Sequence, residues 1–363
     1  MSAQTYNAEN ERIKRRYFAY LKEARRYSES SIDHVAKALN RFENYTRFRE
    51  FRKFHIEQAI GFKRMLAEQR SERSGEALSK STMYSTLAAL KAFFAWLARE
   101  PGFRSRLNYS DAEYFSLSEK DTAIAKATRE KAVPGLEQIL HVLSEMPNGS
   151  EIERRNRALI AFTLLTGARD RAIASFKLRH VDLLGGKVFQ DAREIKTKFS
   201  KTFTTWFFPV GEMPLAIVRD WIEYLTKNKL IGPADPLFPR TEIGHGPGLQ
   251  FAAVGLSRAH WSTASPIRQI FKEAFGAAGL PYFNPHSFRD TLTLLAEKRC
   301  LTPEEFKAWS QNLGHEQVMT TFRSYGSVPQ SRQAELIRKL GQPKVSNDDL
   351  LSKLQQIVAA ASA

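Results

Sequence analysis

The stretch Asn284-Pro285-His286-Ser287-Phe288-Arg289 decides how the rest of the chain is interpreted. His286 and Arg289 are three residues apart, so they fall on one face of a helix that begins here. The preceding Pro285 favours a helix start because its φ angle is fixed. Further on, Leu313-Gly314-His315 predicts a helix end at the glycine, and Tyr325 follows. An imidazole, a guanidinium and a phenol without a thiol or carboxylate cluster suit phosphodiester chemistry better than redox or acyl-transfer chemistry.

Length and charge fit a two-domain protein that binds a polyanion. A chain of 363 residues exceeds the usual size of one compact core. The formal net charge is +16, of which residues 1–132 carry +9 (26 basic and 17 acidic residues) and the remainder +7 (29 and 22). Because the excess is spread over both halves, we expect both to bind one polyanion, and a nucleic acid is favoured over a merely solvated charged surface.

Cysteine content and hydropathy indicate the cellular compartment in which the protein is expected. Cys300 is the only cysteine, so disulfide and thiolate-metal frameworks are not expected, which is consistent with a reducing cytosol. The N-terminus lacks an apolar signal core, and no run approaches about 18 apolar residues. The sequence therefore predicts a cytoplasmic protein with no membrane partner.

Residues 1–110 are predicted to form an N-terminal bundle of four amphipathic helices. The first spans 11–27 and the second opens at Ser30-x-x-Asp33, which resembles a capping box. A third is expected across 55–69, and the fourth carries apolar residues from Met83 to Leu97 at alternating spacings of four and three.

Basic residues in this bundle are interleaved with aromatic ones, notably between positions 41 and 54. Two interpretations are equally favoured: these residues contact nucleic-acid phosphates, or they form a solvated basic loop whose aromatic residues pack locally. The predicted DNA-binding residues are Arg12, Arg15, Arg16, Arg47, Arg49, Arg52, Lys53, Lys80 and Lys91.

Residues 111–132 lose apolar periodicity and are predicted to be an interdomain linker. A helix is expected to start at Val133-Pro134, and the next helix, 151–166, ends in Thr166-Gly167-Ala168-Arg169. A glycine stop followed by arginine directs that guanidinium out of a buried helix end. Taken alone, an ordinary surface arginine after a helix cap is the favoured interpretation.

The pattern then changes to a small antiparallel sheet formed by 187–195 and 201–210, with a basic segment, 196–201, at its hairpin. A lysine there could act in a groove as a point charge or proton donor, or could belong to a solvated turn. Helices are expected at 213–228 and 265–278, joined by a connection rich in proline and glycine. The fold class is therefore mainly α with a small antiparallel β-sheet: a helical bundle plus a mixed α/β domain.

Taken in order, Thr166-Gly167-Ala168-Arg169, the hairpin lysines, His286-x-x-Arg289, Leu313-Gly314-His315 and Tyr325 resemble the tyrosine recombinase (phage integrase) family. The resemblance covers a catalytic domain at 133–340, and the bundle is similar to the family's core-binding domain. An isolated HxxR would be weak, whereas five elements in the family's order are specific.

The resemblance implies a role for each matched residue. Tyr325 matches the nucleophile that forms a 3′-phosphotyrosyl link, and Arg169 and Arg289 match the arginines that bind the non-bridging phosphate oxygens. His286 matches the residue that helps take the phenolic proton, and His315 the hydrogen-bond donor to the phosphate. Lys198 is preferred over Lys201 as the general acid. No metal or other cofactor is implied.

One departure from the family is Ala172, which stands where an acidic residue is usual. Asp170 is not expected to replace it, so Arg289 and His286 need other support.

The resemblance implies site-specific recombination of double-stranded DNA through a Holliday junction, with four protomers around two duplexes and a C-shaped clamp of the two domains. It also implies a nucleoid-associated protein of bacterial or phage type, with accessory DNA-bending proteins as possible further partners. In the tail, 341–363, Leu350, Leu351, Leu354 and Ile357 at helical spacing predict a helix that docks on a neighbouring protomer. Two alternatives remain: a type IB topoisomerase-like enzyme that relaxes DNA, and a DNA-binding regulator of the same fold that forms no adduct.

Overall fold

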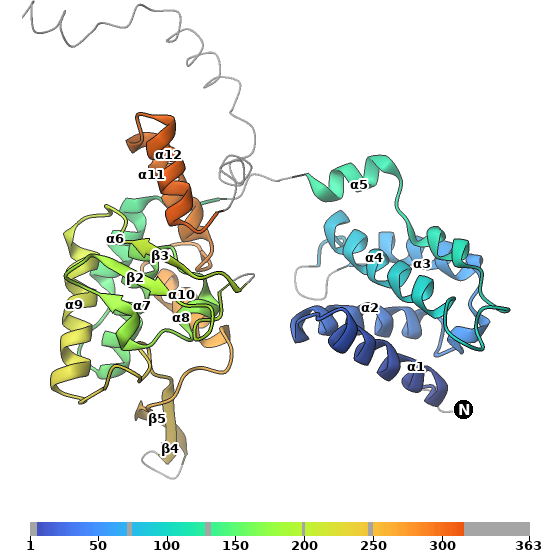
Figure 1. The fold of residues 1–363 in the computed structure, drawn as a ribbon, viewed down its shortest axis with the longest axis horizontal. Helices are drawn as coiled ribbons and strands as arrows, with labels where there is room; N and C mark the ends of the chain where they lie inside the picture. The colour runs from blue at the N-terminus through green and yellow to red at the C-terminus, as the bar shows by residue number, and fades with distance from the viewer. Residues whose placement is uncertain (1–5, 71–74, 128–131, 198–199, 246–249, 316–363) are drawn as a thin grey trace, which may run out of the picture. The chain divides into compact units, whose positions relative to one another are not determined.

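The computed structural model of the chain describes residues 6–70, 75–127, 132–197, 200–245 and 250–315. The chain divides into two compact units, Met1–Ala127 and Thr128–Ala363 (Figure 1). Lys198, Tyr325 and the predicted tail helix lie outside the described residues.

The first unit is built of helices joined by loops, and the four predicted helices are confirmed. In chain order its elements are α1 (Ala8–Ala19), the π-helix η1 (Tyr20–Ala24), α2 (Glu29–Tyr45), η2 (Phe51–Lys53), α3 (Ile56–Glu68), α4 (Lys80–Leu97), η3 (Tyr109–Phe115) and α5 (Glu119–Lys126). The second helix starts earlier than predicted, because Ser28 and not Ser30 provides the cap: its Oγ accepts a hydrogen bond from the backbone N–H of Ser31 at 3.3 Å.

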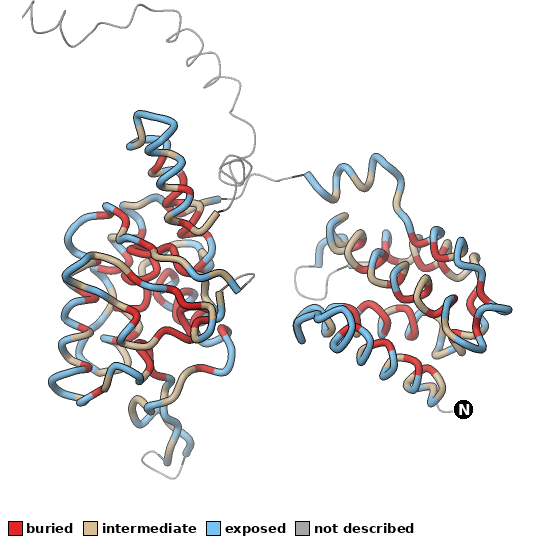
Figure 2. Tube along the Cα trace, in the orientation of Figure 1, coloured by how far each residue is buried: buried red, intermediate tan, exposed pale blue. Residues whose placement is uncertain are grey.

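The core of this unit is aromatic. Phe42, Phe54 and Phe94 pack against one another, with ring centroids 4.1 Å apart for Phe54 and Phe94. Phe115 completes the cluster and is fully buried. Buried residues recur along the helices of this unit (Figure 2). The predicted linker therefore differs from the structure: η3 and α5 pack against α4 and belong to the first unit. The sequence did not show this because only Ala112 and Phe115 of the η3 segment are buried, which gives no helical periodicity.

The second unit combines helices with two small sheets. Its elements are α6 (Leu136–Glu145), α7 (Glu151–Thr166), α8 (Asp170–Ile173), η4 (Leu178–His180), β1 (Val181–Asp182), β2 (Lys187–Gln190), β3 (Phe203–Trp206), α9 (Glu212–Lys227), β4 (Thr241–His245), β5 (Phe251–Leu256), α10 (Ser265–Ala277), α11 (Ser287–Arg299) and α12 (Pro303–Asn312). The helix predicted to start at Val133-Pro134 begins at Leu136 instead, after Gly135.

Helix α7 lies at the centre of this unit, because every residue from Ala158 to Thr166 is buried. A helix that is apolar on all sides belongs inside a core. At its N-terminus Ser150 and Glu153 form a capping box, with the Glu153 N–H donating to Ser150 Oγ at 3.2 Å. At its C-terminus Gly167 has a φ of 58°. The helix therefore delivers that glycine, and Arg169 after it, to a fixed place.

The first sheet has the order β1-β2-β3; the antiparallel pair β2–β3 was predicted, whereas β1 was not, and all three strands are short. Strand β2 ends where Asp191 Oδ1 accepts the N–H of Arg193 at 2.9 Å, forming a side-chain turn. After β3, the N–H of Phe208 donates to the Leu165 carbonyl at 2.8 Å, so the chain leaves the sheet for α7. Each strand therefore ends inside its predicted range, at a single hydrogen bond that takes the chain out of the sheet.

The hairpin β4–β5 was not predicted; a glycine- and proline-rich connection was expected there. Its two strands pair antiparallel with an irregularity between Glu242 and Ile243. Apolar residues such as Ile243, Phe251 and Val254 remain exposed. Because neither face is buried in a core, the strands lack the apolar alternation that would have revealed them.

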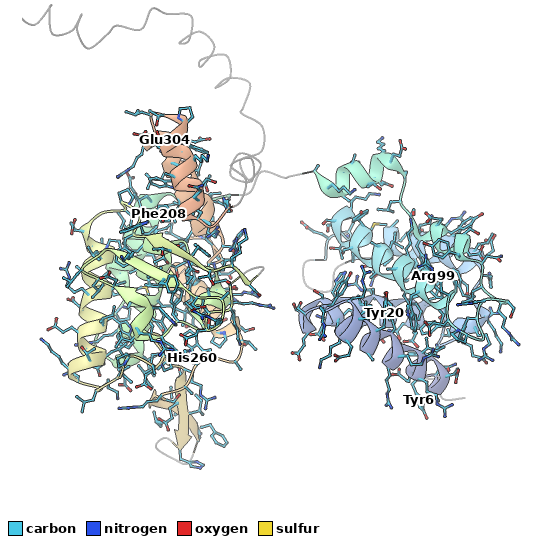
Figure 3. The ribbon with its side chains drawn as sticks, in the orientation of Figure 1. Tyr6, Tyr20, Arg99, Phe208, His260 and Glu304 are labelled. Carbon is cyan, nitrogen blue, oxygen red and sulfur yellow. The ribbon has the colours of Figure 1, made fainter. Side chains whose placement is uncertain are left out.

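Helices α11 and α12 form a hairpin that projects from the rest of the second unit (Figure 1). Glu304, at the start of α12, lies at its far end, whereas Phe208 lies at its base, with its ring 4.9 Å from that of Trp309 (Figure 3). Within the described ranges, none of the helices has both the length and the apolar content needed to cross a membrane.

Candidate active site

Arg289 is the buried centre of the candidate site. It lies in the first turn of α11, is 4% exposed, and donates from Nη1 to the carbonyl of Gly167 at 2.6 Å. Nη2 donates to the carbonyl of Leu313. Burial, and then the charge of Arg169, lower the pKa of Arg289 to about 9, so the guanidinium stays protonated at neutral pH. The site therefore holds a fixed positive charge against two main-chain carbonyls.

The corner after α7 is shaped for this contact. A Cβ on Gly167 would lie 2.9 Å from Leu313 Cδ2 and 3.0 Å from Leu292 Cδ1, so a side chain there would disturb the residues around Arg289. Thr166 fastens the same corner: its hydroxyl donates to the Phe162 carbonyl at 2.7 Å and accepts from the Ala168 N–H at 3.2 Å. The predicted Thr-Gly-Ala-Arg motif thus builds a rigid backbone turn.

Arg169 follows this turn at the N-cap of α8 and is partly buried, which lowers its pKa. Its charge lowers the pKa of both Arg289 and His315, so the three side chains share one neighbourhood. Within the described residues no hydrogen bond engages the Arg169 guanidinium. Its five donors are therefore available to a bound anion.

His315 completes the cluster from the far end of α12. Its Nε2 lies 3.0 Å from Arg289 Nη2. A guanidinium only donates, so Nε2 accepts and the ring proton of the neutral imidazole is on Nδ1. Burial, followed by the charges of Arg289, Arg169, His286 and Lys201, lowers the pKa of His315 to about 4. At neutral pH this residue is therefore an uncharged donor.

The charges of His286 and Lys201 also lower the pKa of His315, so both side chains lie in its neighbourhood. His286 is exposed at the N-cap of α11, and its backbone N–H donates to Asn284 Oδ1 at 2.9 Å. Lys201 is partly buried, just before β3. The structure thus brings together five of the seven predicted catalytic residues, while Lys198 and Tyr325 lie outside the described residues.

The strand that follows Lys201 is tied to the helix that precedes His315. Asn312, at the end of α12, accepts the N–H of Trp206 at 2.7 Å and donates its amide to the Trp206 carbonyl at 2.8 Å. Thr205 Oγ1 donates to the Asn312 carbonyl at 3.1 Å. Sequence reasoning missed Asn312, since nothing in a single sequence marks an asparagine that pairs with a strand 106 residues away.

The support for Arg289 differs from the family pattern, as the departure at Ala172 implied. Ala172 is 1% exposed within the apolar core. Asp170 turns to α10 instead, where its Oδ2 accepts from Arg268 at 2.6 and 2.8 Å. Two backbone carbonyls and His315 hold Arg289, and within the described residues its buried Nε has no hydrogen-bond partner. Backbone acceptors leave no signal in a sequence.

The predicted DNA-binding residues of the first unit differ in their surroundings. Arg12, Arg15, Arg47 and Arg49 are exposed, with Arg12 showing 79% of its side chain. Arg16 pairs with Glu100, and Lys53 with Glu50 at 2.9 Å.

The other three basic residues of that set are engaged within the first unit. Arg52 lies 5.4 Å from the Phe103 ring centroid. Lys80 pairs with Asp121 at 3.0 Å and Lys91 with Glu113 at 2.6 Å, so both join α4 to the segment that follows it. Arg12 also lies 3.6 Å from Glu9, so ion pairs within the first unit engage several members of this set, and their role in DNA binding stays a prediction.

The gathered groups define what the site can do. Two guanidiniums and one ammonium lie around the neutral imidazole of His315. None of the groups that shift the pKa of His315 is a carboxylate. Such a set stabilises an anion whose charge grows during reaction, as at a phosphorus under attack. Among the described residues no cluster of histidine, cysteine and carboxylate side chains could hold a metal ion.

Comparison with known proteins agrees with this chemistry. Residues 134–332 match the phage integrase family, and residues 15–101 match the phage integrase N-terminal SAM-like domain. The chain is 23% identical over 259 residues to the tyrosine recombinase XerC of Lactobacillus leichmannii, covering 68% of this chain and 72% of that protein.

Two solved structures share the fold. One is the Tn1549 transposon integrase in complex with transposon right end DNA, with a TM-score of 0.59 and 14% identity over 91% of this chain and 99% of that one. The other is a lambda integrase tetramer bound to a Holliday junction, with a TM-score of 0.55 and 13% identity over 86% and 78% of the two chains.

Proposed function

The chain belongs to the phage integrase family, and on that premise we propose that it is a tyrosine-type site-specific DNA recombinase that cleaves and rejoins strands through a 3′-phosphotyrosyl intermediate. The observation that carries the proposal is the convergence of Arg169, Arg289, His286, His315 and Lys201 on one place. These groups come from four separate elements, and a chance gathering of basic side chains would cost electrostatic energy without an anion to bind.

The proposed cleavage step assigns each group one task. The phenolic oxygen of Tyr325 attacks the phosphorus while its proton passes to His286. Arg169 and Arg289 bind the non-bridging oxygens, and Nδ1–H of His315 donates to the same phosphate. As the bond between phosphorus and the 5′-oxygen breaks, a lysine ammonium of the β2–β3 connection gives its proton to the 5′-oxygen. Rejoining to a partner strand is the reverse, with the free 5′-hydroxyl as nucleophile.

Replacement of the proposed nucleophile tests this function. Tyr325→Phe removes only the phenolic oxygen, so we expect DNA binding within about 3-fold of the parent and a loss of covalent adduct of at least about 1,000-fold. The measurement is adduct formation on a nicked suicide duplex that carries the chain's own site, identified by sequencing the DNA that the parent protein traps.

The control is Tyr109→Phe, since Tyr109 is exposed in the first unit. An undiminished adduct from Tyr325→Phe would assign the nucleophile to another residue. A parent protein that binds DNA tightly but forms no adduct would instead be the DNA-binding regulator. Relaxation of a supercoiled plasmid without paired sites would favour the topoisomerase-like alternative.

We also propose that the chain assembles on DNA as a tetramer, with its C-terminal helix docked on a neighbouring protomer. An apolar groove of about 750 Å³ between β3 and α12 supports this. Phe203, Trp206, Phe207 and Trp309 line it, and Trp206 is 55% exposed. A leucine-rich helix from residues 348–363 has the chemistry to fill it. Accessory DNA-bending proteins and action at the nucleoid belong to the same proposal.

A further inference from the structure

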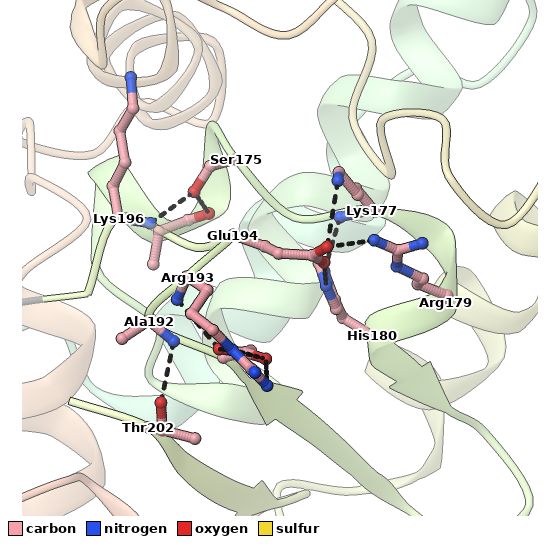
Figure 4. Close-up of polar contacts among 11 residues, drawn as sticks. Ser175, Lys177, Arg179, His180, Ala192, Arg193, Glu194, Lys196 and Thr202 are labelled. Carbon is pink, nitrogen blue, oxygen red and sulfur yellow. Dashed lines mark hydrogen bonds and ion pairs between the residues drawn. The ribbon is translucent and has the colours of Figure 1, made fainter. Parts of the chain in front are cut away.

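Glu194 anchors the connection between β2 and β3, which spans residues 191–202 (Figure 4). Its Oε2 lies 2.7 Å from His180 Nε2, and its Oε1 is reached by Arg179 and, at 3.6 Å, by Lys177. All three partners belong to the segment just before β1. The carboxylate therefore pins the connection to the body of the second unit.

The contact with His180 has a definite direction. His180 is 5% exposed, and its Nδ1 accepts the backbone N–H of Lys177 at 3.0 Å. The ring proton must then be on Nε2, which donates to Glu194. That hydrogen bond, followed by the one from Arg179, lowers the pKa of Glu194, so the carboxylate stays ionised at neutral pH. A buried, singly oriented imidazole makes this a rigid anchor.

The rest of the connection is fastened on both sides of Glu194. Lys196 donates its backbone N–H to Ser175 Oγ at 3.0 Å, close behind α8. Thr197 Oγ1 donates to the Lys201 carbonyl at 2.8 Å, and the Ala192 N–H donates to Thr202 Oγ1 at 3.0 Å (Figure 4 shows the Ser175 and Thr202 contacts). The backbone position of Lys201 is therefore coupled to that of the anchored limb.

We propose that Glu194, acting through His180, is a positioning residue for the lysine that protonates the leaving 5′-oxygen. The inference rests on the proposed recombinase function and deepens it. A lysine has a flexible four-carbon stem, so its placement depends on the backbone that carries it. A displacement of about 1 Å in such a group can cost about 100-fold in rate. Glu194 need not touch the DNA to control this step.

The chemistry of the leaving group separates positioning from general stability. In the natural substrate an alkoxide would leave, so the new phosphorus–oxygen bond to Tyr325 forms while a lysine proton passes to the 5′-oxygen. If sulfur replaces that oxygen, a thiolate leaves. Its conjugate acid has a pKa near that of a cysteine thiol, about 8.5, and it departs without a proton. A variant that is slow only because proton donation is impaired should therefore cleave the sulfur-containing duplex at the parent's rate.

The experiment compares the full-length parent with Glu194→Ala on two suicide duplexes of the same sequence, one with oxygen and one with sulfur at the 5′ bridging position. We expect Glu194→Ala to slow adduct formation about 10- to 100-fold on the oxygen duplex and to stay within about 3-fold of the parent on the sulfur duplex. Glu194→Gln keeps an oxygen that accepts from His180 Nε2–H, so its rate on the oxygen duplex should lie between those of the parent and Glu194→Ala.

Three controls make the outcome decisive. Glu223→Ala removes an exposed carboxylate paired with Lys227 on α9 and should behave as the parent on both duplexes. Lys198→Ala and Lys201→Ala identify the general acid: it is the lysine whose replacement slows adduct formation on the oxygen duplex but not on the sulfur duplex. Thermal melting shows whether each variant folds.

Equal slowing of Glu194→Ala on both duplexes, or no slowing on either, would overturn the positioning role. If the parent forms no adduct at all, the proposed function itself fails. If a lysine variant is restored by sulfur and Glu194→Ala is not, only the role of Glu194 fails.

Discussion

Arg289 shows how one residue can keep its charge available in a buried site. The carbonyls of Gly167 and Leu313 fix the guanidinium with neutral acceptors, and the charge of the adjacent Asp290 acts on it as well. Burial, and then the positive charge of the nearby Arg169, lower the pKa of Arg289. The result is a site that is electrostatically strained when empty and relieved by a phosphate.

Gly167 provides the sharpest test at this scale. Gly167→Ala forces a left-handed residue, at a cost of about 1 kcal/mol, and presses a methyl group into Leu313 and Leu292. With the clash, we expect the free energy of unfolding to fall by about 2–4 kcal/mol. Cleavage should fall further, because the carbonyl that holds Arg289 moves. Denaturant unfolding and suicide-substrate cleavage measure the two effects.

Gly279→Ala is the matched control. Gly279 also has a positive φ, of 69°, but a Cβ there would meet nothing within 4 Å. We expect this variant to lose about 1 kcal/mol and no activity. Equal effects of the two substitutions would mean that backbone strain alone, and not the contact with the Arg289 pocket, determines the role of Gly167.

The catalytic residues that could be predicted from sequence are those with a reactive side chain at characteristic spacing. His286, Arg289, Arg169 and His315 were singled out in this way; the structure places them in one neighbourhood, and their catalytic roles stay a prediction. The groups that hold them were not found, because the carbonyls of Gly167 and Leu313 exist at every position of every chain. Asn312 likewise has no recognisable sequence signal, because its contact with Trp206 depends on tertiary structure alone.

At the scale of elements, helices were predicted better than strands. Helices α4, α7, α9 and α10 have an apolar stripe or a buried run longer than two turns, and this periodicity is readable. Hairpin β4–β5 has no such signal, because its apolar residues are exposed and glycines interrupt it. Segment η3 was missed for the opposite reason: Phe115 and Ala112 are buried within a largely polar stretch.

The groove between β3 and α12 gives a prediction about assembly. Trp206→Ser removes an exposed aromatic from the groove, so folding should be little changed, whereas docking of a leucine-rich helix should weaken. We expect the protein concentration needed to assemble two DNA sites to rise about 10-fold or more. Native gel electrophoresis of two-site complexes measures it.

Phe189→Ser is the control for this prediction. Phe189 is 47% exposed on the neighbouring strand β2 and is not among the residues that line the groove. Leu354→Ser, in the predicted tail helix, should reproduce the defect of Trp206→Ser. If Leu354→Ser assembles normally while Trp206→Ser does not, the groove binds something other than the tail.

At the scale of the whole molecule, the two-domain organisation could be predicted from length, although its boundary was placed too early. With the boundary at residue 127, the first unit carries 24 basic and 16 acidic residues and the second 31 and 23, so each has a formal charge of +8. This equal division supports binding of one DNA duplex by both units.

Salt dependence tests this shared binding. Each neutralised phosphate contributes about 0.9 to the slope of log affinity against log salt, so contacts with about 6–10 phosphates predict a slope of roughly −5 to −9. Arg47→Gln with Arg49→Gln removes two exposed charges from the loop after α2 and should lessen the slope by up to about 1.8. Lys227→Gln, whose ammonium pairs with Glu223, should leave the slope unchanged. Fluorescence anisotropy between 50 and 300 mM salt measures all three; a parent slope of only about −1 to −2 would mean that one unit alone binds the duplex.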